Sequence, residues 1–526
     1  MGHGPRQGWR VCQQSGRGEG GCFVSLRPNI LLIQTDQQRG DAFGAAGDPY
    51  VQTPVLDRLA AEGTNFTRCY TPSPVCVPAR AALLTGLLPH RNGCVNNGSG
   101  LHGGLPTLMG RLAEAGYTTH GVGKMHFSPP RRAMGFQSLD LSEEIPRSVA
   151  EDDYLTFLQS RGYGHVHEPH GVRSDMYYVP QVSQLPAHLH TTAWTADRAA
   201  AFLRGWDQSR PFFLWTSFIK PHPPFDPPVP WNKLYRTVDM PRPLRPDGYA
   251  MWQTWWMRHQ NRYKYRESGP DDTLCRTIRA AYYGCISFID YHIGRLLRVL
   301  AATGQLDRTL ILFTSDHGEL LGDFGSFGKR SFLEPAGRVP LLARLPGRFA
   351  AGAVCERAVS LVDLMPTALA AAQVEPGDTD GCDLAEVAGA TGERTVFGQL
   401  DQGARGVYMA CDGRLKYFHS VPDRRDYLFD LQRDPRELQN RADDPAAAVE
   451  LAEMRRRLRE RLLRDGYDAP FDGTDWREPP PPPEPRDADN DRIFQEAQWT
   501  DPWPHFPGYT PTWQPEGRGA ARRAGW

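Results

Sequence analysis

The sequence of 526 residues predicts an α/β fold. A large domain with a mostly parallel central sheet, flanked by helices, is expected to precede a smaller α+β domain with an antiparallel sheet. Two short apolar runs of equal length, residues 29–35 and 309–315, are typical of buried strands. Helical patterns lie between these runs, and the alternation favours a parallel sheet. After about residue 380 the pattern changes to shorter strand-like pieces, which indicates the second domain.

The first helix is expected shortly after the first strand. Thr53 is a suitable N-cap, Pro54 suits the first helical position, and Gly63 ends the apolar pattern. Further helices are predicted over residues 105–115, 277–302 and 361–372. These helices would supply the crossovers that parallel strands require.

The C-terminal part has a different pattern. Strand-like pieces are followed by an Arg-rich helix, at residues 395–399, 406–410, 415–418 and 446–464. We therefore expect four parts: a disordered extension over residues 1–26, a large catalytic domain over 27–380, a small α+β domain over 381–467 and an extended tail rich in Pro and Trp over 468–526.

Charge and hydropathy exclude several classes of partner. Lys and Arg (60) nearly cancel Asp and Glu (61), which removes the electrostatic argument for a nucleic-acid partner or an anionic membrane. No run approaches the ~20 consecutive apolar residues that a bilayer requires. The first 26 residues contain no apolar core with a cleavage site, and the ten cysteines have no paired spacing. We therefore expect a cytoplasmic protein with reduced thiols and no membrane partner.

Potential ligands follow both predicted strands. Asp36 and Gln37 come directly after the first strand, and Asp316 and His317 directly after the second. Since α/β sheets gather their active sites at the carboxyl ends of strands, these side chains are expected to converge. Two carboxylates, an amide and an imidazole suit a hard divalent cation better than zinc. The alternative for either motif alone is a helix cap.

Cys76 lies where a helix is predicted to begin. Pro78 fits the first helical turn, and Ala81 begins an apolar helical run. The helix dipole and free N–H groups there favour an anionic ligand or nucleophile, and Arg80 returns one turn later on the same face. A thiolate at this position would be activated. The alternative is an inert packed cysteine.

Cys76 also opens the run Cys-Val-Pro-Ala-Arg, which Ala-Ala-Leu-Leu-Thr-Gly follows. This run resembles the modification segment of the formylglycine-dependent (type I) sulfatases of the alkaline-phosphatase-like superfamily. Other segments similar to that family occur in the family's order, at residues 29–39, 53–66, 121–126, 220–225, 315–329, 339–346 and 427–440. The resemblance covers about residues 27–464 and implies an alkaline-phosphatase-like large domain.

The resemblance implies that a formylglycine-generating enzyme oxidises Cys76 to formylglycine (3-oxoalanine), whose aldehyde hydrates to a geminal diol. One hydroxyl would attack sulfur, and deprotonation of the second would release the sulfate and regenerate the aldehyde. Arg80 would orient the formylglycine. The resemblance also implies one divalent cation, Ca²⁺ first and Mn²⁺ or Mg²⁺ as alternatives, with ligands from Asp36, Gln37, Cys76, Asp316 and His317.

Further roles follow from the same resemblance. Lys124 and His126, in Gly-Lys-Met-His, are similar to the family's sulfate clamp and base. His222, in Lys-Pro-His-Pro-Pro, and Lys329, in Phe-Gly-Lys, are similar to the pair that neutralises and protonates the leaving oxygen. Asn97 is a candidate for contacting a sulfate oxygen. A lone Lys or His is usually a solvated or satisfied residue, but their joint occurrence favours a site.

Several positions depart from the commonest family pattern. Gln37 stands where many members have a second Asp, and His317 where Asn is common; this variant occurs in members that act on small sulfates and on phosphonates or phosphodiesters. Val77 and Ala79 also differ from frequent choices. We favour a sulfatase acting on a small sulfated substrate. The alternatives are a phosphonate monoester or phosphodiester hydrolase with the same nucleophile, and a non-catalytic anion-binding relative.

Substrate specificity is expected to depend on residues 136–190 and 227–270, which are rich in Trp, Tyr and Arg. Trp252, Trp255 and Trp256 are expected either to wall the pocket or to lie in the core. The tail is long enough to wrap around a neighbouring subunit, so a homo-oligomer is a further hypothesis.

Overall fold

The computed structural model describes residues 27–127, 129–146, 148–173, 177–264 and 271–483. The predicted N-terminal extension and residues 484–526 of the predicted tail lie outside the described residues.

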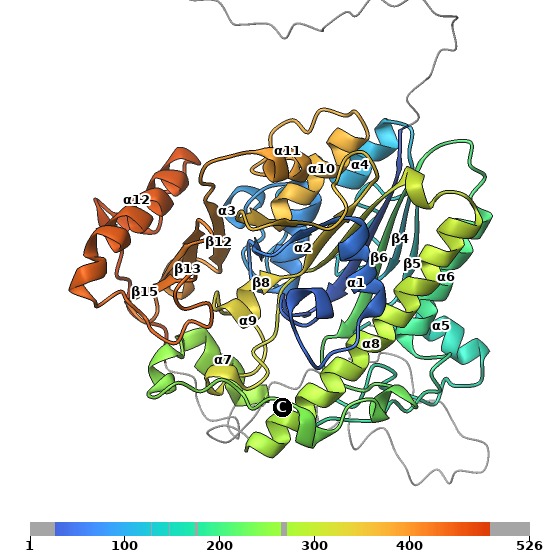
Figure 1. Ribbon diagram of the computed structural model, residues 1–526, viewed down its shortest axis with the longest axis horizontal. Coiled ribbons are helices and arrows are strands. Elements are labelled where there is room, and N and C mark those ends of the chain that lie inside the picture. Colours follow the sequence, from blue (N-terminus) through green and yellow to red (C-terminus); the bar gives the residue numbers. More distant parts are fainter. Residues whose placement is uncertain (1–26, 128, 147, 174–176, 265–270, 484–526) are drawn as a thin grey trace, which may run out of the picture.

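An eight-stranded sheet lies at the centre of the molecule (Figure 1). Its strands, in spatial order, are β10 (Ala353–Cys355), β2 (Thr64–Phe66), β9 (Leu341–Arg344), β7 (Thr309–Ser315), β1 (Asn29–Asp36), β6 (Phe212–Pro221), β4 (Thr118–Gly123) and β5 (Ser138–Leu141). Among the described strand pairs of this sheet, only those that β9 makes with β2 and β7 are antiparallel. The predicted mostly parallel sheet is therefore confirmed.

The two predicted strands are central neighbours in this sheet. β1 and β7 pair in parallel, with Leu31 opposite Ile311 and Thr35 opposite Ser315, and every residue of both strands is buried. Along β1, Ile30 and Leu32 belong to one hydrophobic core, and the alternate residue Leu31 belongs to another. Burial on both faces explains why the strands are continuous apolar runs instead of alternating ones.

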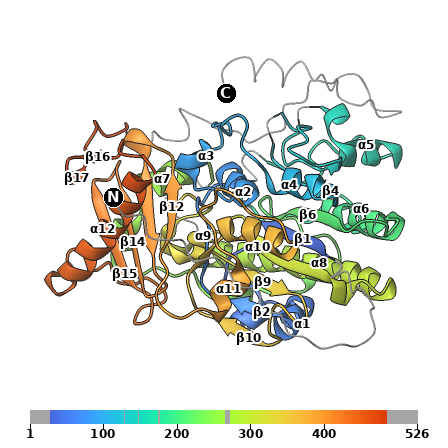
Figure 2. The ribbon, with the colours of Figure 1, turned by 90° about the horizontal axis from the view of Figure 1, so that it is seen from above.

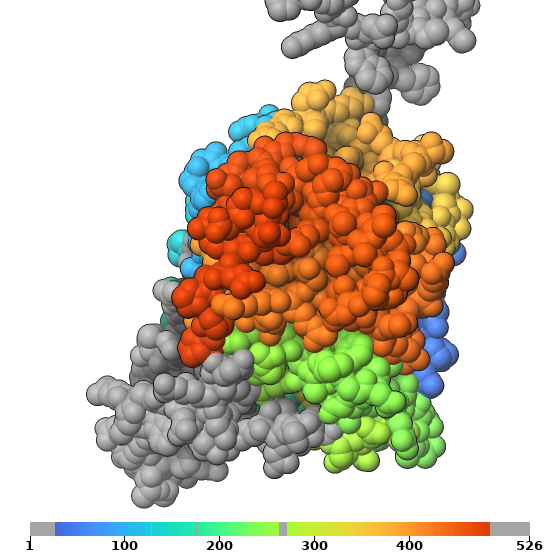
Figure 3. All heavy atoms as spheres, turned by 90° about the vertical axis from the view of Figure 1, so that its left-hand side faces the viewer, coloured from blue at the N-terminus to red at the C-terminus, as the bar shows by residue number. Residues whose placement is uncertain are grey.

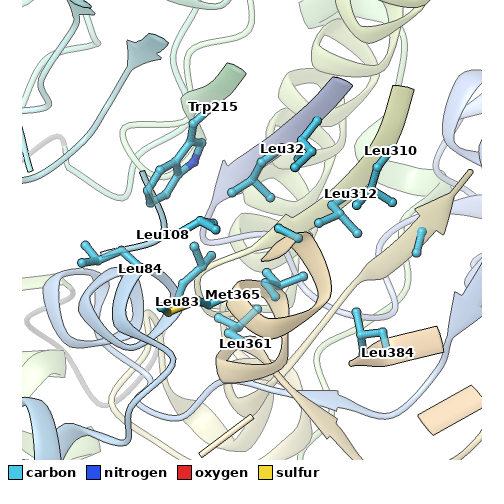
Figure 4. Packing of buried hydrophobic residues seen from close by; sticks show 14 of the residues in the cluster. Leu32, Leu83, Leu84, Leu108, Trp215, Leu310, Leu312, Leu361, Met365 and Leu384 are labelled. Carbon is cyan, nitrogen blue, oxygen red and sulfur yellow. The ribbon is translucent and has the colours of Figure 1, made fainter. Parts of the chain in front are cut away.

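Helices cover both faces of the sheet (Figures 1 and 2). One face packs against α2 (Cys76–Thr85), α4 (Leu108–Glu114), α10 (Leu364–Ala371) and α11 (Leu384–Gly389), as Figure 4 shows for part of this core. The other face packs against α1 (Pro54–Glu62), α6 (Thr191–Gly205) and α8 (Asp272–Ala302). Shorter helices are α3 (Pro89–Asn92), α5 (Asp153–Ser160), α7 (Trp255–Lys264) and α9 (Glu334–Gly337).

Three predicted helix boundaries need correction, including that of the helix predicted over residues 105–115, which begins at Leu108. The long helix begins at Asp272 instead of residue 277, because the Asp271 side chain caps it by accepting a hydrogen bond from the Leu274 N–H. The helix predicted from residue 361 begins with a 3₁₀ turn over Leu361–Asp363. A signal for the start of the long helix was present, since Asp271 is a favourable N-cap.

No helix among the described residues combines the length and the apolarity needed to cross a membrane.

A separate antiparallel sheet forms the C-terminal part and covers one face of the molecule (Figure 3). Its strands are β12 (Val396–Leu400), β13 (Val407–Cys411), β14 (Leu415–Ser420) and β15 (Arg425–Asp430). The helix α12 (Ala448–Arg464) packs on it through Met454, Leu458 and Leu462. A further sheet has three strands, β11 (Val359–Ser360), β3 (Cys69–Tyr70) and β8 (Arg338–Val339).

The first residues of the predicted tail are folded. A hairpin of β16 (Phe471–Asp472) and β17 (Asp475–Trp476) packs Phe471 and Trp476, each 6% exposed, against the core beneath α12. These two aromatic side chains bury apolar surface that an extended tail would leave in water. An extended segment from residue 468 onward is therefore not what the structure shows for residues 471–476.

The three tryptophans of the predicted specificity region lie in the core. Trp252, Trp255 and Trp256 are 9%, 3% and 7% exposed and pack in one cluster with residues of β12 to β15. Of the two alternatives weighed from the sequence, core packing is the one that the structure supports. These side chains attach the C-terminal sheet to the large domain.

Candidate active site

Four potential ligands converge at the carboxyl ends of β1 and β7. Asp36 is the last residue of β1, Asp316 and His317 follow β7 directly, and Cys76 is the first residue of α2. The ligand atoms of these four side chains all lie within 4.8 Å of one another. All four residues are buried, with exposed fractions of 0–1%. Parallel pairing of β1 and β7 brings the two strand ends together, as the sequence predicted.

The imidazole of His317 is oriented by its own backbone neighbour. Its Nδ1 lies 3.1 Å from the Gly318 carbonyl oxygen, so Nδ1–H donates there and Nε2 is left as an acceptor. Nε2 lies 3.7 Å from Oδ1 of Asp36, 3.6 Å from Oδ1 of Asp316 and 3.2 Å from Sγ of Cys76. This is the tautomer that a metal-binding histidine requires.

Gln37 adjoins the cluster in a strained backbone conformation, with φ of 69°. Its Nε2 contacts the Glu319 carboxylate and the Tyr178 hydroxyl, the latter at 3.2 Å. Its Oε1 accepts a hydrogen bond of 2.9 Å from Nζ of Lys329. The amide oxygen therefore points to the side of the cluster on which Lys329 lies.

Buried cations balance the two aspartates. Nζ of Lys124 lies 2.6 Å from Oδ2 of Asp36 and 2.6 Å from Oε2 of Glu144. Nε of Arg80 lies 3.0 Å from Oδ2 of Asp316, and its Nη2 lies 3.3 Å from Oδ2 of Asp36. Burial and the neighbouring charge of Asp36 nevertheless raise the pKa of Asp316. A divalent cation would relieve this repulsion, so the donor set fits such an ion.

Cys76 lies in a strongly electropositive setting. Its Sγ is 2.8 Å from Nζ of Lys329. Burial would raise the pKa of the thiol, but the positive charges of Lys329 and Lys124 outweigh burial and hold this pKa well below its usual range. The same setting would stabilise any anionic oxygen that takes the place of the sulfur.

A cavity of about 460 Å³ opens over Cys76. His126, His222, Lys329 and Asn97 line it, so the structure brings all of these predicted residues to one space. The side-chain oxygen of Asn97 accepts a hydrogen bond of 3.2 Å from the Val77 N–H at the start of α2. Asn97 is exposed, whereas Lys124 is completely buried and is not one of the residues that line the cavity.

The two histidines of the cavity differ in their contacts. His126 has φ of 59°, its N–H donates to Oε1 of Glu143 at 2.9 Å, and its buried Nδ1 has no hydrogen-bond partner among the described residues. Nδ1 of His222 lies 2.7 Å from the Pro223 carbonyl oxygen. Burial lowers the pKa of His222 to about 4 despite the nearby carboxylate of Glu144. His222 is therefore neutral at pH 7 in the free enzyme.

Sequence reasoning missed several polar residues of the site. Glu144 joins Lys124 to Arg173, whose Nη2 lies 2.7 Å from Oε1 of Glu144. Ser217 accepts a hydrogen bond of 2.8 Å from Arg80, and Glu319 contacts Gln37. Glu144 and Arg173 lie in loops with no spacing signal. Glu319 had one, since it follows His317 by two positions in the run Asp-His-Gly-Glu.

Known proteins resemble this chain over most of its length. A family model described as Sulfatase matches residues 28–374, and a model described as N-sulphoglucosamine sulphohydrolase, C-terminal, matches residues 322–464. The chain is 32% identical to an arylsulfatase of Clostridium perfringens, over 79% of this chain and 90% of that protein. It is 31% identical to a choline-sulfatase of Rhizobium meliloti, over 81% of this chain and 85% of that protein.

The fold also matches solved structures. Phosphonate monoester hydrolase of Agrobacterium radiobacter gives a TM-score of 0.72 at 28% identity, over 84% of this chain and 96% of that chain. The predicted sulfatase-type, alkaline-phosphatase-like fold is thereby confirmed. Because the Sulfatase model spans most of the described chain and the curated relatives are similar over nearly their whole length, the chain belongs to the sulfatase family and is a sulfuric ester hydrolase.

Proposed function

We propose that this enzyme cleaves a sulfate monoester with a nucleophile formed from Cys76 by oxidation to formylglycine. The proposal rests on the direction in which this side chain points. Its Sγ lies 3.2 Å from Nε2 of His317 and 2.8 Å from Nζ of Lys329, at the mouth of the ligand cluster. The sulfur stands where the oxygens of hydrated formylglycine would lie. A formylglycine-generating enzyme is then the partner that maturation requires.

The ligand cluster supports one divalent cation, held by Asp36, Gln37, Asp316, His317 and the side chain at position 76. Oxygen donors with a single imidazole suit a hard ion, so Ca²⁺ is the first expectation and Mn²⁺ or Mg²⁺ the alternatives. When bound, the cation would lower the pKa of a formylglycine hydroxyl and so activate the nucleophile.

The surrounding side chains have separable tasks in this proposal. Arg80 contacts Asp36 and Asp316 and would thereby fix the two carboxylates that surround the nucleophile. Lys124 and Lys329 would bind sulfate oxygens from two sides, and the cavity-lining His126 would accept the proton that releases the sulfate. Asn97 would donate to a sulfate oxygen at the rim.

Lys329 is the better candidate for protonating the leaving oxygen. In His222, Nδ1–H points to the Pro223 carbonyl, and a pKa of about 4 leaves Nε2 without a proton at pH 7. Burial would lower the pKa of Lys329, but the charges at Cys76 and Asp36 raise it, so its Nζ carries a proton at pH 7 in the unconverted protein. Nε2 of neutral His222 would accept a hydrogen bond and so orient the substrate. The negative charge of bound sulfate would raise the pKa of His222 and favour its protonation.

The organic group of the substrate would lie against the apolar side of the cavity. This side is formed by Leu84, Leu101, Phe127, Pro130 and Met134. Three of them, Leu101, Phe127 and Met134, are partly buried and pack against the central core, so the wall is firmly supported. An aromatic or aliphatic alcohol portion would pack against these residues, and Ser99, Arg132 and Arg330, which also line the cavity, would bind its polar substituents.

A phosphonate monoester or phosphodiester hydrolase is the second candidate function. The similarity to the Agrobacterium radiobacter enzyme supports it. The occurrence of both Gln37 and His317 at the ligand cluster supports it as well. The same nucleophile and cation would serve either reaction, because both transition states are trigonal bipyramidal and anionic.

Rates on an aryl sulfate, an aryl phosphodiester and a phenyl phosphonate monoester, measured with one preparation under matched conditions, test the proposal. We expect the largest kcat/KM for the sulfate and no turnover of any substrate by Cys76→Ala. A larger kcat/KM for the phosphonate would assign the second function. Equal turnover by Cys76→Ala would reject the nucleophile itself.

A further inference from the structure

We propose that Glu319 is a positioning residue that fixes which end of the Gln37 amide faces the cation site. The inference rests on the cation site of the proposed function. Glu319 touches none of the reacting atoms, so it would act only through Gln37.

Glu319 is surrounded by hydrogen-bond donors and is completely buried. Its Oε1 accepts from the Leu321 N–H at 3.0 Å and from the Gly328 N–H. Its Oε2 accepts from the Tyr178 hydroxyl at 2.9 Å and from Nε2 of Gln37. An ionised carboxylate is an acceptor only, and these four donors satisfy it without a cation.

This arrangement decides the orientation of the Gln37 amide. The two ends of a primary amide are nearly the same in shape but opposite in hydrogen bonding. Glu319 accepts only, so it selects the NH₂ end; Lys329 donates only, so it selects the oxygen at 2.9 Å. A flipped amide would set oxygen against carboxylate and NH₂ against ammonium. The oxygen, which is the end that binds a hard cation, is thereby presented to the ligand side.

The backbone that carries Glu319 is itself anchored. Its N–H donates to the Pro335 carbonyl at 2.8 Å, and the preceding Gly318 N–H donates to the Ala336 carbonyl at 2.8 Å. Asp316 and His317, two ligands, precede these residues directly. One rigid run of four residues thus supplies two ligands and the side chain that orients a third.

Glu319→Gln tests the role with little change of volume. The new amide has one oxygen and one NH₂ group, so its NH₂ would face one pair of the four donors that the carboxylate accepts from, and the Gln37 amide would lose its fixed orientation. We expect roughly 10- to 100-fold weaker binding of Ca²⁺ or Mn²⁺, the usual effect of changing an outer-shell partner. Isothermal titration of each ion into protein with unconverted Cys76 measures this without turnover.

Two further variants make the test specific. Glu437→Gln changes another completely buried glutamate, which lies 2.6 Å from Nζ of Lys416 in the C-terminal part, and should leave the dissociation constant unchanged. The exchange Gln37→Glu with Glu319→Gln restores complementarity, because the two oxygens of a carboxylate are equivalent and the new Gln donates to them. We expect this double variant to regain most of the lost affinity.

The proposal is overturned if folded Glu319→Gln binds both ions as the native protein does, or if the exchange variant binds no better than Glu319→Gln. Should Glu319→Gln fail to fold, the exchange variant alone decides: folded protein with no measurable ion binding contradicts the role. Failure of the proposed function would look different, because native protein would then bind the ion and turn over no sulfate ester.

Discussion

Arg80 binds four groups in the site through one buried guanidinium. It is 1% exposed, contacts both Asp36 and Asp316, and donates to the Lys124 carbonyl at 2.6 Å and to Ser217 at 2.8 Å. Two buried carboxylates depend on this one guanidinium. Removing one partner of a buried charge cluster leaves an uncompensated charge, which costs more than the pair itself contributes.

Arg80→Met should therefore destabilise the metal-free protein by about 3–5 kcal/mol. Urea unfolding followed by circular dichroism measures the change. Arg58 is a matched control, because it pairs with Glu62 but its side chain is 71% exposed; Arg58→Met should change the free energy of unfolding by less than about 0.5 kcal/mol. Equal effects of the two substitutions would show that buried charge compensation is unimportant here.

The site residues at strand ends could be predicted from the sequence, but most of the charged residues that contact them could not. Asp36, Asp316 and His317 each follow an apolar run directly, so strand geometry alone brings them together. Lys124 and Lys329 needed the family resemblance, because nothing local distinguishes a buried lysine from a solvated one. Glu144 and Arg173 meet through folded loops, and no sequence pattern encodes that contact.

At the scale of elements, close approach of β4 to β6 sets the position of Lys124. Gly123 ends β4 with φ of 93°, and a Cβ added there would lie 2.0 Å from the Ser217 carbonyl oxygen. The next residue, Lys124, donates its N–H to that same oxygen at 2.9 Å. A side chain at position 123 would therefore push the strands apart directly beside the site.

Gly123→Ala should lower both stability and turnover. Gly47 has nearly the same φ, 92°, with nothing within 4 Å of an added Cβ, so Gly47→Ala isolates the cost of the left-handed conformation, about 1–2 kcal/mol. Overpacking should add about 1–3 kcal/mol for Gly123→Ala. Thermal unfolding and kcat/KM of both variants provide the comparison. Indistinguishable variants would argue against a close approach at this strand end.

Asp290 links two helices and should make stability depend on pH. This α8 side chain accepts hydrogen bonds from the Val55 N–H at 3.1 Å and the Leu56 N–H at 2.8 Å at the start of α1. Burial nevertheless raises the pKa of Asp290 from 3.8 to about 7. Between these values the folded state binds more protons than the unfolded state, so this group's contribution to stability falls as pH rises.

Asp290→Asn removes that titration. The stability of the variant relative to the native protein should therefore improve as pH rises from about 4 to about 7. Urea unfolding at several pH values measures the difference, with the exposed Asp239 replaced by Asn as the control. Parallel pH curves for native protein and Asp290→Asn would contradict a raised pKa.

Which elements exist was more predictable than how they pair. β1, β7, α1 and the strands of the C-terminal sheet follow from local patterns near their predicted positions. The order of the central sheet does not, because β6 enters between β1 and β4 from far along the chain. Such non-local pairings are decided by the packing of whole faces, which a single sequence does not display.

For the whole molecule, the C-terminal sheet is bound to the large domain by core packing and by buried charge. Lys416 of β14 lies 2.7 Å from Glu334 and 2.6 Å from Glu437. Trp252, Trp255 and Trp256 pack in one cluster with residues of the C-terminal sheet. The carbonyl of Pro483 accepts a hydrogen bond of 3.1 Å from Nε1 of Trp255. The described chain is therefore anchored to its last residue.

Truncation after Pro483 tests the hypothesis that the tail joins subunits. It spares the packed hairpin of β16 and β17, which truncation at residue 467 would remove. If the tail forms a homo-oligomer, light scattering should give a multiple of 58.9 kDa for the full chain and the mass of one chain after truncation. Retention of the same assembly by the truncated protein would assign the contacts to another surface.

The proposed chemistry depends on the side chain at position 76. Mass spectrometry of the peptide that contains Cys76, on preparations made with and without a formylglycine-generating enzyme, measures the converted fraction directly. We expect kcat on an aryl sulfate to rise in proportion to that fraction and to vanish when conversion is absent. Full activity in a preparation whose Cys76 is entirely unmodified would contradict the proposed nucleophile.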